Sequence, residues 1–347
     1  YGKAEPFYGD ALEMRKRLYP PAKYPDGHPD LATSLNGLGD LLYARGEYAK
    51  AEPYFRDALE MRKRLYPAEK YPDGHPDLPR SLNNLGILLE ARGEYAKAEP
   101  YLRDALEMTK SLYPAEKYPD GHPDLATSLN NLGILLEARG EYAKAEPYYR
   151  DALEMSKRLY PPEKLPEGHP DLAQSLNSMG FLLYGRGEYA KAEPYIRDAL
   201  EMRKRLYPAE RYPEGHPDLT TSLNNLAALL AARGEYAKAE SHLRDALEMT
   251  KRLYPAERYR AGHPDLATSL NNLGILLEAR GEHGKAADSL AQGATMYDRL
   301  TAAFAEGGAE AEALNLAASL PRTRFALLSV TGHLEGTDPS DCYAVLW

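Results

Sequence analysis

The pentapeptide Gly-His-Pro-Asp-Leu occurs six times in this chain, and its histidines are always 47 residues apart: His28, His75, His122, His169, His216 and His263. A strict period of this length is typical of a solenoid, in which each unit buries its apolar face only against its neighbours. The period therefore outweighs the ordinary expectation that 347 residues form two or three separate domains.

The copy that starts at His122 predicts a helical hairpin. Its first helix, called helix A here, is expected over 123–139, with leucines at i, i+4, i+7 and i+11 on one face and Gly140 ending it. Helix B follows at once, with Pro147 near its start, and ends at Tyr160 before Pro161. A polar connector rich in proline and glycine then leads to the next copy.

Applied along the chain, this pattern predicts an all-α fold, a right-handed α-solenoid of hairpins with a 47-residue period. A leading helix B is expected at about 3–19, and six A–B pairs complete an array over residues 1–300. The six A helices are expected near 30–45, 77–92, 124–139, 171–186, 218–233 and 265–280. A capping helix is predicted at 301–320, followed by a helical tail at 321–347.

The hairpin resembles a tetratricopeptide repeat. The residues at the spacings of that family are Leu129, Leu132, Gly133, Leu136, Ala145, Tyr149 and Ala152. Leucine stands where the family has tryptophan, and the period is 47 rather than about 34 residues. The motifs "LNNL", "GEYAKAEP" and "HPD" are similar to the kinesin-light-chain-like subfamily. The tail, with "LLSVT" and a terminal "YAVLW", resembles the connector to a CHAT caspase-like peptidase domain.

Composition and motifs exclude several functions. A net charge of −9 argues against a general nucleic-acid binder, and the longest apolar runs are too short to span a membrane. A single cysteine suits a reducing compartment, so a cytoplasmic location is expected. We find no motif for catalysis or for a cofactor, so neither is expected. The histidines lie in repeats whose helices pack about 8–10 Å apart, too far to share a metal, and are expected to start helices.

The resulting prediction is a scaffold that binds an extended peptide or protein segment. Two alternatives remain: a sensing arm of a CHAT peptidase, or a structural rod that self-associates through its exposed ends. The resemblance implies that helix A lines the binding groove. A uniform asparagine row would then hold the partner's backbone: Asn36, Asn83, Asn130, Asn177, Asn224 and Asn271, with Asn131 beside it. The alternative is that these asparagines bridge adjacent A helices.

Two variable rows on the same helical face would then select the partner's side chains. The first row holds Asp40, Ile87, Ile134, Phe181, Ala228 and Ile275, and the second holds Tyr43, Glu90, Glu137, Tyr184, Ala231 and Glu278. Because these residues are apolar, aromatic and acidic, the expected partner has apolar anchors and some Lys or Arg.

Overall fold

A computed structural model describes residues 5–306 and Val330 of the chain, and within them every regular element is a helix. The helices are α1 (Glu5–Leu18), α2 (Pro29–Ala44), α3 (Tyr48–Leu65), α4 (Asp77–Ala91), α5 (Tyr95–Leu112), α6 (Pro123–Ala138), α7 (Tyr142–Leu159), α8 (Pro170–Gly185), α9 (Tyr189–Leu206), α10 (Pro217–Ala232), α11 (Tyr236–Leu253), α12 (Pro264–Ala279) and α13 (His283–Glu306). The predicted all-α solenoid is confirmed. Each predicted helix A lies within a residue or two of an observed helix.

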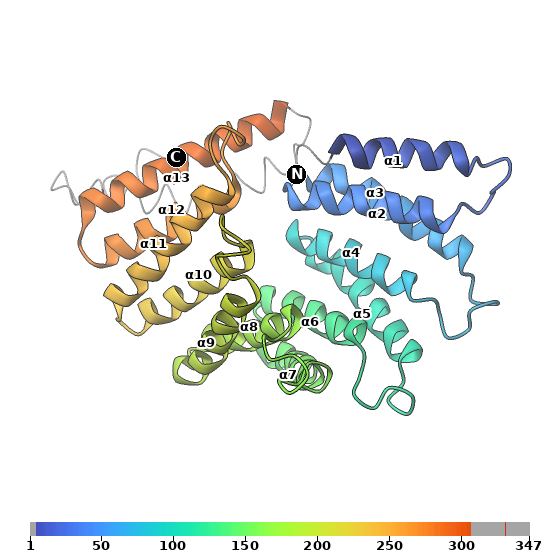
Figure 1. The fold of residues 1–347 in the computed structure, drawn as a ribbon, viewed down its shortest axis with the longest axis horizontal. Coiled ribbons are helices and arrows are strands. Elements are labelled where there is room, and N and C mark those ends of the chain that lie inside the picture. The colour runs from blue at the N-terminus through green and yellow to red at the C-terminus, as the bar shows by residue number, and fades with distance from the viewer. Residues whose placement is uncertain (1–4, 307–329, 331–347) are drawn as a thin grey trace. The chain divides into compact units, whose positions relative to one another are not determined.

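The chain forms two compact units, Tyr1–Pro161 with α1 to α7 and Pro162–Trp347 with α8 to α13. Within each unit the even-numbered helices are A helices, and each packs most extensively against the helix B that follows it in the chain. Each helix B then packs against the next helix A of its unit, so that the hairpins stack in tandem (Figure 1). No helix in the described part of the chain is long and apolar enough to cross a membrane.

Close packing inside five of the six described hairpins involves the glycine at the position of the Leu-Gly pair, and α10 has Ala227 at this position. In the third complete hairpin, Leu132, Leu136 and Ala145 are fully buried or nearly so, and Tyr149 is 1% exposed. A Cβ atom added to Gly133 would lie 2.6 Å from the Tyr149 ring, so only glycine lets the ring lie flat against helix α6. The family spacing of these residues therefore reflects direct contact between α6 and α7.

Helix A ends as its glycine predicts. Gly140 has φ +74, and the amide of Glu141 donates to the carbonyl of Leu136 at 2.8 Å, which closes the last turn of α6. The proline of helix B differs from expectation, because α7 begins at Tyr142 and Pro147 is its sixth residue. Proline there removes one backbone hydrogen bond of the second turn, since only the first four amides of a helix are free.

Ion pairs on the outer surface link each helix B to the hairpin that follows it. Glu99 on α5 pairs with Arg103 on its own helix and with Arg139 at the end of α6. Arg139 also pairs with Glu141, the residue that precedes α7. The same arrangement joins Glu52 to Arg92 in the first unit. Such pairs are partly exposed and individually weak, so they support the stack rather than create it.

The connectors are held by their tyrosines. Tyr66, which follows α3, stacks on His75 with ring centroids 3.6 Å apart, and Tyr71 meets the His75 ring edge-on at 5.4 Å. Tyr113, Tyr118 and His122 repeat this arrangement in the next connector. The connector tyrosines thus pack against the histidine that starts the next helix A and do not form a separate row of free rings.

The last described helix passes through the residue at which the capping helix is predicted to begin. Helix α13 runs from His283 to Glu306 without interruption, so no boundary separates residues 300 and 301. The rest of the predicted capping helix and the tail that resembles a CHAT connector lie outside the described residues, apart from Val330.

We expect Tyr71→Ala and Tyr118→Ala each to lower the free energy of unfolding by about 1–2 kcal/mol. Each substitution removes an edge-on aromatic contact and the apolar area that it buries. Thermal and urea denaturation of the purified chain measure the loss. Tyr236→Ala is the control, because Tyr236 at the start of α11 is as exposed as Tyr118 but has no ring contact among the described residues. An unchanged melting temperature in both connector variants would contradict this role.

We also expect the chain to self-associate through α1. Four large apolar side chains of this helix are exposed: Phe7 74%, Tyr8 42%, Met14 63% and Leu18 60%. Their counterparts Phe55 and Met61, one repeat later, are buried against α2 and the connector before it. Sedimentation velocity over a range of concentrations tests this, and Phe7→Ser with Met14→Ser should reduce association. A monomer at the highest concentration, with α1 protected from hydrogen exchange, would contradict it.

Candidate functional site

The side chains of the asparagine row are less exposed than side chains that only line an open groove. Asn36, Asn83, Asn130 and Asn177 are only 6–8% exposed, and Asn224 and Asn271 are partly buried. Their amides therefore lie where the A helices meet, with some of their atoms engaged between helices. Buried amides of this kind need hydrogen-bond partners, and the partners come from two neighbouring elements.

In the first unit, a chain of hydrogen bonds fixes the orientation of Asn83. Thr109 Oγ1 on α5 donates to the carbonyl of Ala105 at 2.5 Å, so the Ser128 hydroxyl on α6, 3.2 Å away, must donate to Thr109. Ser128 Oγ is then free to accept, and Asn83 Nδ2 donates to it at 2.9 Å. The Asn83 side-chain oxygen consequently points away from this chain of bonds.

Arginine takes the place of threonine one repeat earlier. Arg62 on α3 is 3% exposed, and its guanidinium donates to Ser81 Oγ at 2.6 Å and to the carbonyl of Asp77 at 3.3 Å. In the amide orientation that hydrogen bonding requires, the Asn36 oxygen accepts from the same guanidinium. Burial lowers the pKa of Arg62. Here the asparagine turns its oxygen inward, opposite to Asn83.

The second unit contains the same two arrangements. Arg203 on α9 is 2% exposed and donates to Ser222 Oγ at 2.8 Å and to Gln174 Oε1 at 2.8 Å. Thr250 on α11 lies 3.2 Å from Ser269 Oγ, as Thr109 lies from Ser128. These buried polar residues of helix B were missed from the sequence. The signal that could have identified them is a 47-residue position that changes in character: Arg15, Arg62, Thr109, Ser156, Arg203 and Thr250.

Several amide atoms of the asparagine rows have no partner within the described part of the chain. These buried atoms are Oδ1 of Asn83, Asn130, Asn224 and Asn271, and Nδ2 of Asn131. In contrast, Asn177 Oδ1 accepts from Asn225 Nδ2 at 2.9 Å between α8 and α10. The row therefore bridges A helices at some positions and leaves a hydrogen-bond acceptor unused at others.

The variable rows of the first unit are half-buried and acidic. Ile87, Glu90, Ile134 and Glu137 all have intermediate exposure on α4 and α6. Burial raises the pKa of Glu90 and of Glu137 above the usual glutamate value. Glu137 accepts a hydrogen bond from the Tyr149 hydroxyl at 2.6 Å, whereas neither carboxylate has a cationic partner among the described residues.

On α2, Asp40 and Tyr43 hold the corresponding positions. Asp40 as a whole residue is exposed, but neighbouring atoms partly enclose its carboxylate. This burial raises the pKa of the Asp40 carboxylate. Asn84 Nδ2 lies 3.4 Å from Asp40 Oδ1. Tyr43 packs against Tyr48 with ring centroids 5.1 Å apart. The first unit thus carries three acidic side chains and one tyrosine along these two rows.

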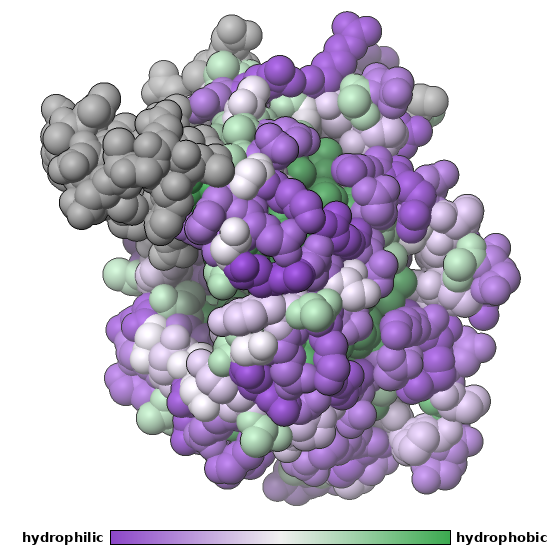
Figure 2. Space-filling view, turned by 90° about the vertical axis from the view of Figure 1, so that its left-hand side faces the viewer, coloured by the Kyte–Doolittle hydropathy of each residue, from purple (hydrophilic) through white to green (hydrophobic). Residues whose placement is uncertain are grey.

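The second unit presents a different surface at the same positions. Phe181 is 38% exposed and Ile275 is 45% exposed. Phe181 stacks on Tyr184 at 5.6 Å, and Tyr184 in turn contacts Tyr189. On one side of the molecule, hydrophilic residues dominate and apolar ones show only as narrow strips (Figure 2).

The histidines of the repeated pentapeptide start helices, as predicted. His122 Nδ1 accepts from the amide of Asp124 at 3.2 Å, and the same bond recurs at the other five histidines. An acceptor at this position satisfies an amide that the helix leaves free. Among residues 5–306, no group of His, Cys, Asp and Glu has the arrangement of a metal site.

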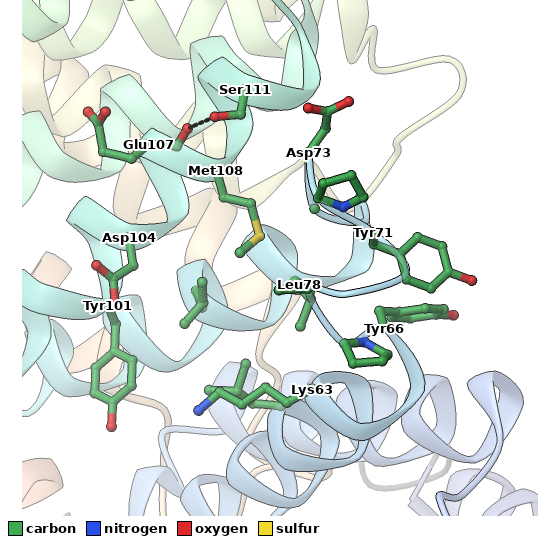
Figure 3. Close-up of a pocket in the computed structure, with 16 residues that line it drawn as sticks. Lys63, Tyr66, Tyr71, Asp73, Leu78, Tyr101, Asp104, Glu107, Met108 and Ser111 are labelled. Carbon is green, nitrogen blue, oxygen red and sulfur yellow. Dashed lines mark hydrogen bonds between the residues drawn. The ribbon is translucent and has the colours of Figure 1, made fainter.

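A separate pocket of about 660 Å³ lies between α3 and α5. Leu78 of α4 lines this pocket, Tyr66 and Tyr71 form one wall, and Met108 projects into it from α5 (Figure 3). Ser111, also on its wall, stands where the other helix B copies before α13 have arginine: Arg17, Arg64, Arg158, Arg205 and Arg252. The pocket contains none of the predicted site residues.

Comparison with known proteins gives a consistent assignment of the fold. A family profile described as tetratricopeptide repeat matches residues 31–77, 80–124, 125–171, 172–218 and 219–265. The crystal structure of BtubC (BKLC) from P. vanneervenii is similar at 26% identity and a TM-score of 0.52, covering 73% of this chain and 91% of that one. Comparison with curated protein sequences gives no match.

Two further solved structures are similar at low identity. The apo form of RapI has 18% identity and a TM-score of 0.52, and the match covers 85% of this chain and 98% of that one. A putative kinesin light chain from Podosopora anserina, with nearly identical TPR-like repeats, has 19% identity and a TM-score of 0.48. That match covers 64% of this chain and 96% of the other.

We expect stability to fall as the pH drops below about 6.5, the ordinary histidine value. Burial lowers the pKa of His122, His216 and His263 in the folded chain. The unfolded chain therefore binds more protons in this range, so the stabilisation is complete above pH 6.5 and is lost as the pH falls through the folded values. Protonation of Nδ1 also removes the acceptor that starts each helix.

Urea denaturation between pH 8 and pH 5.5 measures this slope. The variant His122→Asn, His216→Asn, His263→Asn keeps a capping oxygen at each site but cannot titrate. It should show a flatter pH dependence, whatever its absolute stability. His242 on α11 also has a pKa lowered by burial and contributes equally to both proteins. An equally steep slope in the variant would show that these histidines are not responsible.

Proposed function

Because the chain belongs to the tetratricopeptide repeat family, we propose that it is a protein–protein interaction scaffold that binds an extended segment of a partner along its helix-A faces. Tandem helical hairpins form long surfaces of repeated side chains, and such surfaces are the usual binding sites of repeat proteins. The partner is a protein or peptide.

The observation that carries this proposal is the set of unused amide oxygens. Four of the six asparagines in the row have a buried Oδ1 atom that accepts no hydrogen bond within the described chain. An unpaired buried acceptor costs about 1–3 kcal/mol, so a donor supplied from outside is favoured. Backbone N–H groups of an extended segment are donors that recur at regular intervals, whatever the side chains.

The side chains next to this row supply selectivity. Ile87 and Ile134 lie one turn after Asn83 and Asn130, and Glu90 and Glu137 lie on the same helical face. In the second unit the equivalent positions are aromatic at Phe181 and Tyr184 and small at Ala228 and Ala231, whereas α12 again has Ile275 and Glu278. A constant row with variable neighbours suits a surface that holds any backbone but discriminates between side chains.

Some members of the row have a structural role as well. Asn83 binds Ser128 through Nδ2, and Asn177 accepts from Asn225. Substitution of these two residues therefore alters contacts between A helices in addition to any contact with a partner. Asn130 is the cleaner probe, since no hydrogen bond of its side-chain oxygen links it to the rest of the described chain.

We expect Asn130→Ala with Asn177→Ala to weaken peptide binding by more than about tenfold, because each lost buried hydrogen bond costs roughly 1–3 kcal/mol. The probe is a fluorescein-labelled peptide selected from a random displayed library on the full chain, and fluorescence anisotropy gives its Kd. Asn130→Ala alone should retain most of the thermal stability while losing affinity.

Two controls accompany this measurement. Glu154→Gln alters an exposed residue of α7, on helix B rather than on helix A, and should leave the Kd unchanged. Asn177→Ala alone should lower the melting temperature, because Asn225 loses its acceptor. A double variant that melts far below the wild type but binds normally when cold would mean that the row is structural and that this surface is not the binding site.

A further inference from the structure

The helix-A face of the first unit leaves two buried amide oxygens and one buried amide nitrogen, Asn131 Nδ2, without partners among the described residues, and two of its carboxylates lack a cation. The oxygens of Asn83 and Asn130 are unpaired, and both residues are 8% exposed. On the same face, Glu90 has neither a cation nor a side-chain hydrogen bond among the described residues, and Glu137 has only the Tyr149 hydroxyl. A ligand that fits this face must therefore supply donors and positive charge.

Three features show that this acceptor character is built into the fold. Thr109 and Ser128 force Asn83 to use its nitrogen inward, so its oxygen is the atom left over. Glu90 and Glu137 are half-buried rather than free in solvent, and burial raises the pKa of both. Both carboxylates lie one helical turn beyond an isoleucine, Ile87 or Ile134.

Asp40 differs from the two glutamates, because it already lies in the field of a cation. Burial raises the pKa of the Asp40 carboxylate, and the positive charge of the buried Arg62 guanidinium opposes this rise. Glu90 and Glu137 receive no such compensation from the described residues. A partner cation therefore gains most at these two carboxylates, where the electrostatic interaction is stronger than in bulk water.

We propose that the first unit selects an extended partner segment that carries Lys or Arg, with Glu90 and Glu137 receiving the cations and Ile87 and Ile134 contacting the alkyl stems. This inference rests on the proposed function and specifies the chemistry of the partner. Lysine and arginine suit the site because their aliphatic stems cover apolar side chains while the charged end reaches a carboxylate. Backbone N–H groups of the same segment donate hydrogen bonds to the side-chain oxygens of Asn83 and Asn130. Binding therefore includes a local rearrangement of the side chains that cover these two oxygens.

The second unit lacks this character at the equivalent positions. Its second variable row holds Tyr184, Ala231 and Glu278, so a single carboxylate replaces the adjacent pair. In the first variable row of this unit, Phe181 and Ile275 are exposed apolar residues. The cation preference is thus assigned to the first unit, and substitutions in that unit alone should remove it.

The test uses the full chain and two labelled peptides, one of alternating leucine and lysine and one in which every lysine is glutamate. Fluorescence anisotropy should show that the lysine peptide binds at least about tenfold more tightly, since one hydrogen bond to a charged group contributes roughly that factor. Raising the salt concentration should reduce the difference. Glu90→Gln with Glu137→Gln should abolish most of it, while keeping side-chain size.

Further variants separate charge from stability. Glu90→Lys with Glu137→Lys should reverse the preference in favour of the glutamate peptide, with circular dichroism confirming the helical fold. Glu107→Gln is the matched control, because its side chain is 72% exposed on α5 and it pairs with Lys110. This control should leave the preference unchanged.

The outcomes distinguish the two proposals. If the wild type binds no peptide from the random library, the scaffold function itself fails. If it binds selected peptides but shows equal affinity for the lysine and glutamate peptides, only the cation selectivity is overturned. A lysine preference that survives in the Glu90→Gln, Glu137→Gln variant overturns the assignment to these two carboxylates.

Discussion

Within each unit, a buried polar side chain of helix B hydrogen-bonds to a serine on the following helix A, and this contact sets how the hairpins stack. Arg62 reaches Ser81, Thr109 meets Ser128, and Arg203 reaches Ser222, all in the interior. A buried guanidinium or hydroxyl without a partner would be costly, so a hairpin shifted along its neighbour would lose this pairing. Leucine contacts alone are non-directional and would tolerate such a shift more easily.

The same interaction determines what the asparagine row presents. An arginine in the interior offers only donors, so Asn36 turns its oxygen inward. A threonine bound to its own backbone leaves the serine as an acceptor, so Asn83 turns its nitrogen inward. One substitution behind the surface can thus reverse the hydrogen-bonding polarity of a residue on it, without any change in the fold or in the asparagine itself.

The sequence predicted the repeat, the helices and their ends because these follow from local rules. Leucine spacing, Gly140 and the His122 cap each act within a few residues, and the observed α6 and α7 differ from prediction by about one residue. The place of Pro147 was predicted less accurately, since it lies in the second turn of α7 rather than near its start. The family spacing also located the contact between Gly133 and Tyr149, which joins two helices.

The candidate site was less predictable because burial and amide orientation depend on distant residues. The asparagine row was identified, but its 6–8% exposure at four positions depends on the close approach of adjacent A helices. Arg62 looks like an ordinary cation near the end of a helix, and in a single repeat nothing marks it as buried. Comparison along the repeat does mark it, because the Arg62 and Thr109 position changes in character while its serine partners stay constant.

Near-identity of the repeats limits where function can vary. The serine that joins successive hairpins, such as Ser128, is the same in all six A helices, whereas the two variable rows differ between copies. The buried residue of helix B also differs, but each version among Arg62, Thr109 and Arg203 hydrogen-bonds to that serine. The first unit combines Glu90 and Glu137 with an outward-facing Asn83 oxygen, whereas in the second Phe181 follows an Asn177 oxygen that Asn225 engages. The Asn224 and Asn271 oxygens of the second unit are unpaired like that of Asn83, so the two units differ chiefly in the side chains of the variable rows. These side chains suit them to different chemical features of a partner.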